Sequence, residues 1–294
     1  MDGWGIALGG GGPVGAAWYA GLAEGLLEGH LDLREAGIIV GTSAGAVAGV
    51  WLASGAPVSE FVEAMRRYAT DREECNLAEA VDVDLLMRVY AALSTADAPL
   101  EPAAAREIGS LAARVPVSER DPERHVRDVA RQLPDASWPE RLRAAVVNVT
   151  TGESALLGPA DEIPLDLGVA ASCAAPGLVP PVALGRTLHV DGGARSATNA
   201  DVLARFAVSR ALAISPIPED TPMVGEATRR VLDEECRRLS EAGIGVATVL
   251  PGELEHEAFG FDLIDVAKIP AAIEAGRERG RREAARLIAW LATS

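Results

Sequence analysis

Three short glycine-containing segments hold the residues whose types and spacing could perform nucleophilic chemistry. Residues 41–45 read Gly-Thr-Ser-Ala-Gly, a GxSxG pattern with Ser43 at its centre. A nucleophile on a tight strand-to-helix turn adopts strained backbone angles, and a Cβ two residues away on either side would clash, which accounts for Gly41 and Gly45. The N-terminus of the following helix favours a developing negative charge. We therefore predict that Ser43 is a nucleophile; the alternative is an ordinary serine in a glycine-rich turn.

A glycine run follows the first predicted strand, where residues 10–15 read Gly-Gly-Gly-Pro-Val-Gly. Backbone N–H groups of consecutive glycines can point at one oxygen, so Gly10, Gly11 and Gly12 are candidates for an oxyanion hole. The run also fits the GxGxxG pattern of a dinucleotide site. Such a site requires an acidic residue at the end of the second strand, whereas the nearest acid, Glu35, precedes that strand. A purely structural glycine turn is the third interpretation.

The third segment contains Asp191, Gly192 and Gly193 and follows an apolar strand predicted over residues 187–190. An aspartate at the end of a strand would lie at the same sheet edge as the serine and could accept its proton. An aspartate in an ordinary Asp-Gly turn is the alternative. Because the three segments occur together, we favour Asp191 as the base that deprotonates Ser43.

Two polar residues follow the third segment. We interpret Asn199 as a brace of the loop and Asp201, which precedes the apolar run 202–207, as a helix N-cap. Neither is assigned a catalytic role.

A Ser-His-Asp triad would also need a histidine, and the sequence contains His30, His125, His189 and His256. His189 lies two residues before Asp191, so both can face the same side of a strand, with His189 deeper in the sheet. We expect His30 at a helix end, His125 on a solvent-facing helix and His256 on the surface. The prediction is therefore a Ser–Asp dyad, with His189 as the histidine alternative.

The pattern of elements places the first two segments at one edge of a sheet. Residues 5–8 and 38–40 are apolar runs that predict buried strands, with a helix from about Pro13 to Glu28 between them. A strand, helix, strand order implies parallel pairing with a right-handed crossover. The carboxyl ends of neighbouring parallel strands are where open α/β sheets bind ligands. Further helices are expected over residues 43–54 and 58–69.

Residues 71–140 are charged, show helical periodicity and carry no strand signal. We predict a helical insertion that covers one side of the sheet and could act as a lid. A C-terminal helix is expected over residues 268–292, and the whole chain, residues 1–294, is predicted to form one α/β domain. The helices of the insertion are expected over residues 81–93, 101–113 and 122–133. Later strands are expected over residues 143–149, 154–157, 187–190, 211–215 and 245–250. Another helix is expected over residues 223–241.

Composition and charge limit the possible partners. The formal net charge of −16 argues against nucleic acid and against electrostatic docking on anionic lipid. Five arginines between Arg277 and Arg286 form a solvated helix face or, alternatively, a contact for lipid phosphates. Cys75, Cys173 and Cys236 are far apart and form no CxxC, which argues against a disulfide framework or a zinc site and favours a reducing cytoplasm.

Two stretches without charge, residues 4–23 and 38–59, are long enough to raise the question of membrane spans. Both are interrupted by glycines, fit a strand–turn–helix pattern and lack flanking basic residues. The N-terminus offers only Asp2 and no positively charged region of a signal peptide. We therefore expect a cytoplasmic protein that contacts a membrane at most peripherally.

The three segments, in this order, resemble the patatin-like phospholipase family, which combines a glycine-rich oxyanion loop, a GxSxG serine and a DGG or DGA aspartate without a histidine. Residues 171–177, Ala-Ser-Cys-Ala-Ala-Pro-Gly, and the prolines at 180 and 181 are similar to a fourth segment of the family. The resemblance covers about residues 4–215. The matching catalytic segments are residues 10–15, which end at Gly15, 41–45 and 191–193.

The resemblance implies a three-layer α/β fold without cofactor or metal. It also implies a serine esterase that cleaves fatty-acyl esters of phospholipid or other lipids through a Ser43–Asp191 dyad and an acyl-enzyme. Its partner would be a lipid or acyl-ester substrate, with transient contact to a membrane or micelle surface. The family often has Arg or Lys where this chain has Val14, so a cationic contribution to the oxyanion hole is absent. An acyltransferase or a weakly catalytic lipid-binding relative is therefore an alternative, and a nucleotide-binding oxidoreductase is another.

Overall fold

A central sheet organises the chain. The computed structural model describes residues 3–71, 83–114 and 122–293. Within these residues, eight strands form one sheet in the order β5-β6-β3-β2-β1-β7-β8, and β4 also pairs with β3. The strands are β1 (Gly3–Leu8), β2 (Ile38–Gly41), β3 (Leu142–Asn148), β4 (Ser154–Leu157), β5 (Val182–Leu184), β6 (Thr187–Asp191), β7 (Val208–Ile214) and β8 (Gly245–Val249).

Parallel pairing forms the centre of this sheet. β1 pairs in parallel with β2 and β7, β2 pairs with β3, and β7 pairs with β8. β4, β5 and β6 are joined by antiparallel pairing. The expected parallel pairing of the first two strands is confirmed, and so is the mostly parallel α/β sheet. The carboxyl ends of β1, β2 and β7 therefore lie at the same edge.

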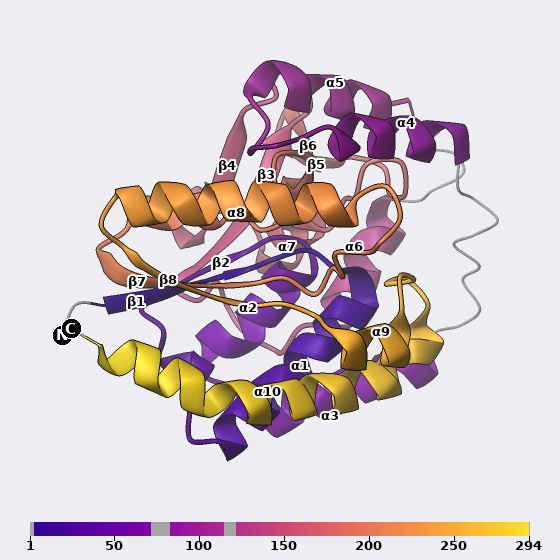
Figure 1. The fold of residues 1–294 in the computed structure, drawn as a ribbon. Helices are drawn as coiled ribbons and strands as arrows, with labels where there is room; N and C mark the ends of the chain where they lie inside the picture. Colours follow the sequence, from indigo (N-terminus) through magenta and orange to yellow (C-terminus); the bar gives the residue numbers. More distant parts are fainter. Residues whose placement is uncertain (1–2, 72–82, 115–121, 294) are drawn as a thin grey trace.

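Helices cover both faces of the sheet, which gives three layers (Figure 1). One face packs against α1, α2, α3, α7 and α10, in a core that contains Trp18, Phe61 and Ile273. The opposite face packs against α8 and the 3-10 helix Ala200–Arg205, around Leu232. The helices are α1 (Gly12–Glu28), α2 (Ala44–Ser54), α3 (Val58–Asp71), α4 (Val83–Ser94), α5 (Pro102–Ala112), α6 (Pro122–Ala130), α7 (Leu165–Ser172), α8 (Gly225–Glu241), α9 (Glu253–Phe259) and α10 (Ile269–Ala292).

The first two helices begin and end where the sequence indicates. α1 starts with a proline in its first turn and stops at Gly29. α2 stops at Gly55, whose φ of 76° is a left-handed conformation that glycine adopts without steric strain. The two predicted strand–turn–helix units are therefore confirmed. Among the described residues, none of the helices combines the length and the apolar character that crossing a membrane requires.

Helix α10 packs tightly against α1, although no sequence motif links the two. A Cβ on Gly25 would lie 2.0 Å from the carbonyl oxygen of Arg277, and one on Gly280 would lie 2.5 Å from that of Leu22. The backbones of the two helices are thus in direct contact. The C-terminal helix is part of the same core as the segments that carry the predicted chemistry.

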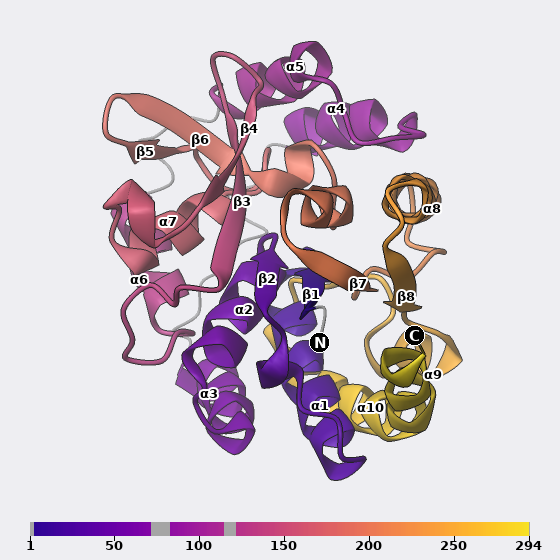
Figure 2. The ribbon, with the colours of Figure 1, turned by 90° about the vertical axis from the view of Figure 1, so that its left-hand side faces the viewer.

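The insertion over residues 71–140 has the predicted helices α4, α5 and α6 in its described part; residues 72–82 and 115–121 lie outside it. The expectation that it covers one side of the sheet is wrong. α4 and α5 pack against β3 and β6 in a cluster with Val147 and Val190. α6 instead contributes Val129 to the core on the opposite face, beside α7 (Figure 2). Alternate residues of β3 point to opposite faces, so both faces need an apolar cover.

Candidate active site

Ser43 lies in a strained turn between β2 and α2. Its backbone has φ 55° and ψ −121°, a positive φ that a residue with a side chain rarely adopts. A Cβ on Gly41 would lie 2.5 Å from the carbonyl oxygen of Gly45, and one on Gly45 would lie 1.9 Å from that of Leu8. Both glycines are therefore required by close backbone approach, for the reason predicted from the GxSxG spacing. The half-buried Ser43 side chain leaves the sheet at the edge where β1 also ends.

The glycine loop after β1 lies directly beside this serine. A Cβ on Gly10 would lie 3.3 Å from the Cβ of Ser43. The N–H of Gly10 already donates to the carbonyl of Ala197 at 2.8 Å. Gly10 is therefore not free to act as an oxyanion donor, contrary to the prediction. The N–H groups of Gly11 and Gly12 donate to no backbone carbonyl among the described residues, which leaves them available for an incoming oxygen.

Residues from other elements hold this loop in place. A Cβ on Gly11 would lie 2.3 Å from the Pro216 ring, so the loop packs directly on the chain that follows β7. The buried hydroxyl of Tyr19 contacts the carbonyls of Gly9 and Ile214 at 3.0 and 2.9 Å. The ends of β1 and β7 are thus tied together just before the candidate donors.

Asp191 reaches the site from the opposite direction to Ser43. It ends β6, which is antiparallel to β3, and it lies opposite Val146 in the register. A Cβ on Gly192 would lie 2.7 Å from the carbonyl oxygen of Ala145, so the turn after Asp191 packs on β3. The carboxylate accepts a hydrogen bond of 2.7 Å from the N–H of Gly193. We expected Asp191 to reach this edge at the end of a strand. The sequence did not predict that this strand, β6, runs antiparallel to β3.

The Asp191 carboxylate is buried, with 5% of its surface exposed, and its surroundings change its acidity. The pKa of Asp191 rises from its ordinary value of 3.8 to about 6, because burial raises it by more than hydrogen bonding from Gly193 and from the Ser43 hydroxyl lowers it. Desolvation disfavours the charged form, so burial dominates here. A carboxylate with this pKa is a better base near neutral pH than an exposed aspartate.

Two residues of the segment 171–177 also contact the candidate dyad, although no role was predicted for either of them. The hydroxyl of Ser172 accepts the N–H of Ser43 at 3.1 Å and donates to the carbonyl of Ala145 at 2.8 Å. Burial raises the pKa of the Cys173 thiol well above its ordinary value, the charge of Asp191 raises it further, and hydrogen bonding with Ser43 lowers it. The resemblance of this segment to the family was the signal that could have pointed to both residues.

The histidines are distributed differently from the prediction. His189 lies opposite Asn148 near the end of β3, so it is farther out along the sheet than Asp191, and the expectation that it lies deeper is wrong. Burial lowers its pKa, and its Nδ1 has no hydrogen-bond partner in the described part of the chain. His125 is not solvent-facing, because its Nε2 is 2.8 Å from the carbonyl of Ala170. His256 is at the surface as expected and contacts Asp220.

Asn199 and Asp201 are both fixed by hydrogen bonds. The Asn199 amide donates to the Thr42 hydroxyl and to the Gly192 carbonyl, at 3.1 and 3.2 Å, which agrees with its interpretation as a brace. Asp201 does not cap a helix. Its carboxylate pairs with Arg195, with contacts of 2.9 and 2.6 Å.

A sequence model described as Patatin-like phospholipase matches residues 6–204 of the chain. The chain belongs to the patatin-like phospholipase family. The matched residues include the glycine loop, the Ser43 turn, the Asp191 turn and the segment 171–177. Membership of this family assigns the chain to the lipid ester hydrolases.

Two solved structures are similar to this patatin-like phospholipase. VipD from Legionella pneumophila has 14% sequence identity and a TM-score of 0.47, with 97% of this chain and 67% of that chain covered. The type III effector protein ExoU has 15% sequence identity and a TM-score of 0.41. The match covers 97% of this chain and 53% of that chain, so this chain spans about half the length of that structure. Both TM-scores are below 0.5, and neither similarity supports a further conclusion. No curated protein matches the sequence significantly.

In this patatin-like phospholipase, Val14 is fully buried in the hydrophobic core, and its N–H donates to the carbonyl of Leu263 at 3.2 Å. The position that is often basic in the family therefore contributes packing here. Among the described residues, no group of three or more His, Cys, Asp or Glu is arranged to hold a metal ion.

The buried Asp191 should lower the stability of the protein at neutral pH. Its folded pKa of about 6 lies above the unfolded value of about 3.9, so the folded state holds the proton more tightly. Stability therefore falls as pH rises from 4 to 6, and the loss persists above that range. We expect Asp191→Asn to raise the free energy of unfolding at pH 8 by on the order of 1–3 kcal/mol and to leave it unchanged at pH 4.

Chemical denaturation at pH 4, 6 and 8 measures this effect. Asp265→Asn is a matched control, because Asp265 is exposed and accepts the N–H of Ala267 two residues later, as Asp191 does with Gly193. The control should show no pH-dependent gain. If the free energies of unfolding of wild type and Asp191→Asn differ by the same amount at all three pH values, burial does not shift the pKa of Asp191.

Proposed function

We propose that this family member is a serine lipid acyl hydrolase that cleaves fatty-acyl esters with Ser43 as nucleophile and Asp191 as the base. One observation carries the proposal. The strained turn places the half-buried Ser43 beside the buried Asp191 carboxylate, whose pKa is about 6 because burial outweighs the lowering effect of hydrogen bonding from Ser43. A nucleophile within hydrogen-bonding reach of a base is the arrangement that covalent catalysis requires.

The arrangement supports a two-step reaction. Asp191 accepts the proton of the Ser43 hydroxyl while the oxygen attacks the ester carbonyl carbon. The tetrahedral oxyanion accepts hydrogen bonds from Gly11 and Gly12, and removing one such donor typically slows a reaction about 10²–10³-fold. The ester bond breaks, and the leaving alcohol takes the proton from Asp191. Water, deprotonated by Asp191, then attacks the acyl-enzyme, and Ser43 leaves with that proton as the fatty acid is released.

We further propose a preference for lipids with a neutral or zwitterionic head group, from the charge of a cleft at the sheet edge where the glycine loop lies. A cleft of about 560 Å³ lies beyond the carboxyl ends of β7 and β8, at the same edge of the sheet as the glycine loop, and its acidic lining residues are Glu219, Asp220, Glu226 and Glu253. The C-terminal arginines are paired with carboxylates of the chain itself, which weakens their interpretation as phosphate contacts. These pairs are Arg277–Glu24, Arg279–Glu255, Arg281–Glu28, Arg282–Glu278 and Arg286–Glu283.

The head-group preference can be measured by fatty-acid release from mixed micelles. We expect faster release from phosphatidylcholine than from phosphatidylglycerol with the same acyl chains, because like charges repel at the acidic cleft. The difference should shrink as salt is added, since screening weakens exposed charges. Faster release from the anionic lipid would contradict the inference.

Activity of single variants tests the dyad. With p-nitrophenyl acyl esters, Ser43→Ala and Asp191→Asn should each lower kcat by about 10³-fold or more, because each removes a member of the reacting pair. His189→Ala should stay within about threefold of wild type. Ser54→Ala, at the exposed far end of α2, is the matched serine control and should be fully active.

Other outcomes of this assay would change the mechanism. Loss of activity in His189→Ala equal to that in Asp191→Asn would replace the dyad with a triad. Full activity of Ser43→Ala would refute the proposed nucleophile. If an added alcohol is acylated faster than water is, the enzyme is an acyltransferase.

The pH dependence of kcat/KM should follow the ionisation of Asp191. The base must be ionised to accept the proton, so activity should fall about tenfold per pH unit below a midpoint near 6 and level off above about 7. Glu235 is another buried carboxyl, and its pKa is raised by burial and by the charge of Asp201. The Glu235→Gln variant should keep the midpoint of the pH profile near 6. If the midpoint is lost in this variant, it belongs to Glu235 instead of Asp191.

A further inference from the structure

One short loop contacts all three segments that carry the proposed chemistry. Residues 195–199, here called the 195–199 loop, follow the turn after Asp191. The carbonyl of Ala197 accepts the N–H of Gly10 from the glycine loop at 2.8 Å. Asn199 donates from Nδ2 to the hydroxyl of Thr42, next to the nucleophile, at 3.1 Å and to the carbonyl of Gly192, next to the base, at 3.2 Å.

The orientation of the Asn199 amide is fixed from both ends. Arg195 donates to its Oδ1 at 2.8 Å, and its Nδ2 also donates to the carbonyl of Ser196 at 2.7 Å. A flipped amide would place Oδ1 against two carbonyl oxygens and the amide nitrogen against a guanidinium. The side chain is 1% exposed, so water cannot replace these contacts.

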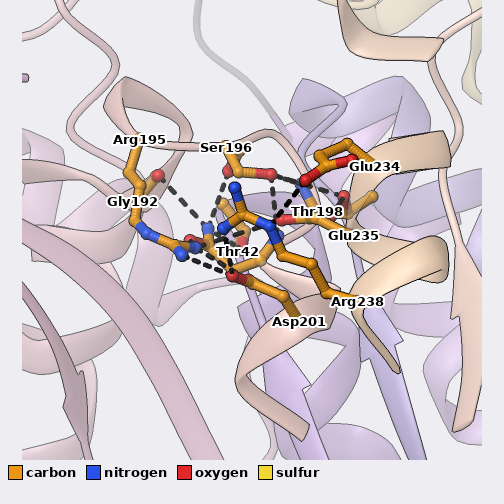
Figure 3. Close-up of polar contacts among 10 residues, drawn as sticks. Thr42, Gly192, Arg195, Ser196, Thr198, Asp201, Glu234, Glu235 and Arg238 are labelled. Carbon is orange, nitrogen blue, oxygen red and sulfur yellow. Dashed lines mark hydrogen bonds and ion pairs between the residues drawn. The ribbon is translucent and has the colours of Figure 1, made fainter. Parts of the chain in front are cut away.

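Helix α8 supports the loop from behind. Glu235, which is fully buried, accepts the hydroxyl of Thr198 at 2.5 Å, and its Oε1 lies 4.0 Å from Arg195. Arg195 pairs with Asp201, which is also 3.6 Å from Arg238 of α8 (Figure 3). Moving one of these buried charges away would leave its partners uncompensated, which is costly. The ion pairs therefore hold the 195–199 loop in its position.

The topology explains why such a loop is needed. The nucleophile turn follows β2 and the base ends β6, and β3 lies between these two strands in the sheet. No ladder of backbone hydrogen bonds therefore joins the two turns directly. A displacement of 1 Å between reacting groups can slow a reaction about 10²-fold, so their separation has to be set by other contacts.

We infer that Asn199 is a positioning residue that sets the separation between the Ser43 turn and the Asp191 turn by hydrogen bonding to Thr42 and Gly192. The inference rests on the proposed function for its kinetic consequence. Asn199 does not touch the substrate. It acts through the two turns, and Arg195 keeps its amide in the orientation that this requires.

The first test compares Asn199→Ala with Asn148→Ala in hydrolysis of a soluble p-nitrophenyl ester. We expect Asn199→Ala to lower kcat about 10²-fold while KM changes less than threefold, because the turns separate but the acyl site remains. Asn148 is a matched control, since its Oδ1 accepts two backbone N–H groups, of Thr150 and Thr151, in the turn between β3 and β4. Asn148→Ala should lower the melting temperature comparably and leave kcat unchanged. Equal loss of kcat in both variants would overturn the inference.

A double-mutant cycle tests whether Asn199 acts through the nucleophile turn. Thr42→Val keeps the shape of the side chain and removes the hydroxyl that Asn199 contacts, so kcat should fall about tenfold. The double variant Thr42→Val/Asn199→Ala should be no slower than Asn199→Ala alone. If the two fold-changes multiply instead, Asn199 does not act through Thr42 and the inference is wrong.

Hydrogen exchange gives a readout that is independent of activity. Asn199→Ala should speed amide exchange in peptides that cover residues 41–46 and 191–196, and Asn148→Ala should not. Unchanged exchange in both peptides would overturn the inference even if activity fell. An inactive wild type, or an active Ser43→Ala, would instead refute the proposed function, while the exchange experiment would still decide whether Asn199 holds the two turns.

Discussion

The strained turn at Ser43 is the constraint on which the rest of the site depends. Its positive φ persists because the surrounding backbone allows no relaxed alternative: the start of α2 packs against the end of β1 so closely that Gly45 has no room for a Cβ beside the carbonyl of Leu8. Ser172 accepts the N–H of Ser43 from the other side. The same contacts that strain the turn bring the glycine loop against it, because that loop begins where β1 ends. The strained conformation of Ser43 and the position of the candidate oxyanion donors beside it are therefore consequences of one packing arrangement.

Burial raises the pKa of Asp191, as the proposed role of base requires, and it also withdraws a polar group from water, which its neighbours compensate. A carboxylate that is withdrawn from water becomes a stronger base near neutral pH, and the price is a less stable folded state. Such a group must be held by specific hydrogen bonds, and it receives one from Gly193. Its backbone N–H donates to the carbonyl of Ala174, so the segment that carries Ser172 and Cys173 holds both members of the proposed dyad. The 195–199 loop makes a second, independent connection on the other side.

The errors in the sequence-based predictions share a physical cause. Strand direction, insertion placement and the partner of a charged side chain are set by residues distant in the chain, and a local pattern does not encode them. The direction of β6 depends on its pairing with β3, which reverses the expected position of His189. Gly10 has the residue type of an oxyanion donor, but its N–H is engaged by Ala197, almost two hundred residues later. Asp201 fits a helix cap locally, yet Arg195 captures it.

The sequence by itself determined the two strand–turn–helix units, the need for glycine at positions 41 and 45, and membership of a family of lipid ester hydrolases. These follow from local periodicity and from steric limits that act over two or three residues. Only the tertiary structure decided how Asp191 meets Ser43, which glycines keep a free N–H, and how Asn199 connects turns from strands that do not touch. Those features depend on side-chain contacts between distant segments and on burial, because hydrogen bonds and desolvation exist only once the chain has packed.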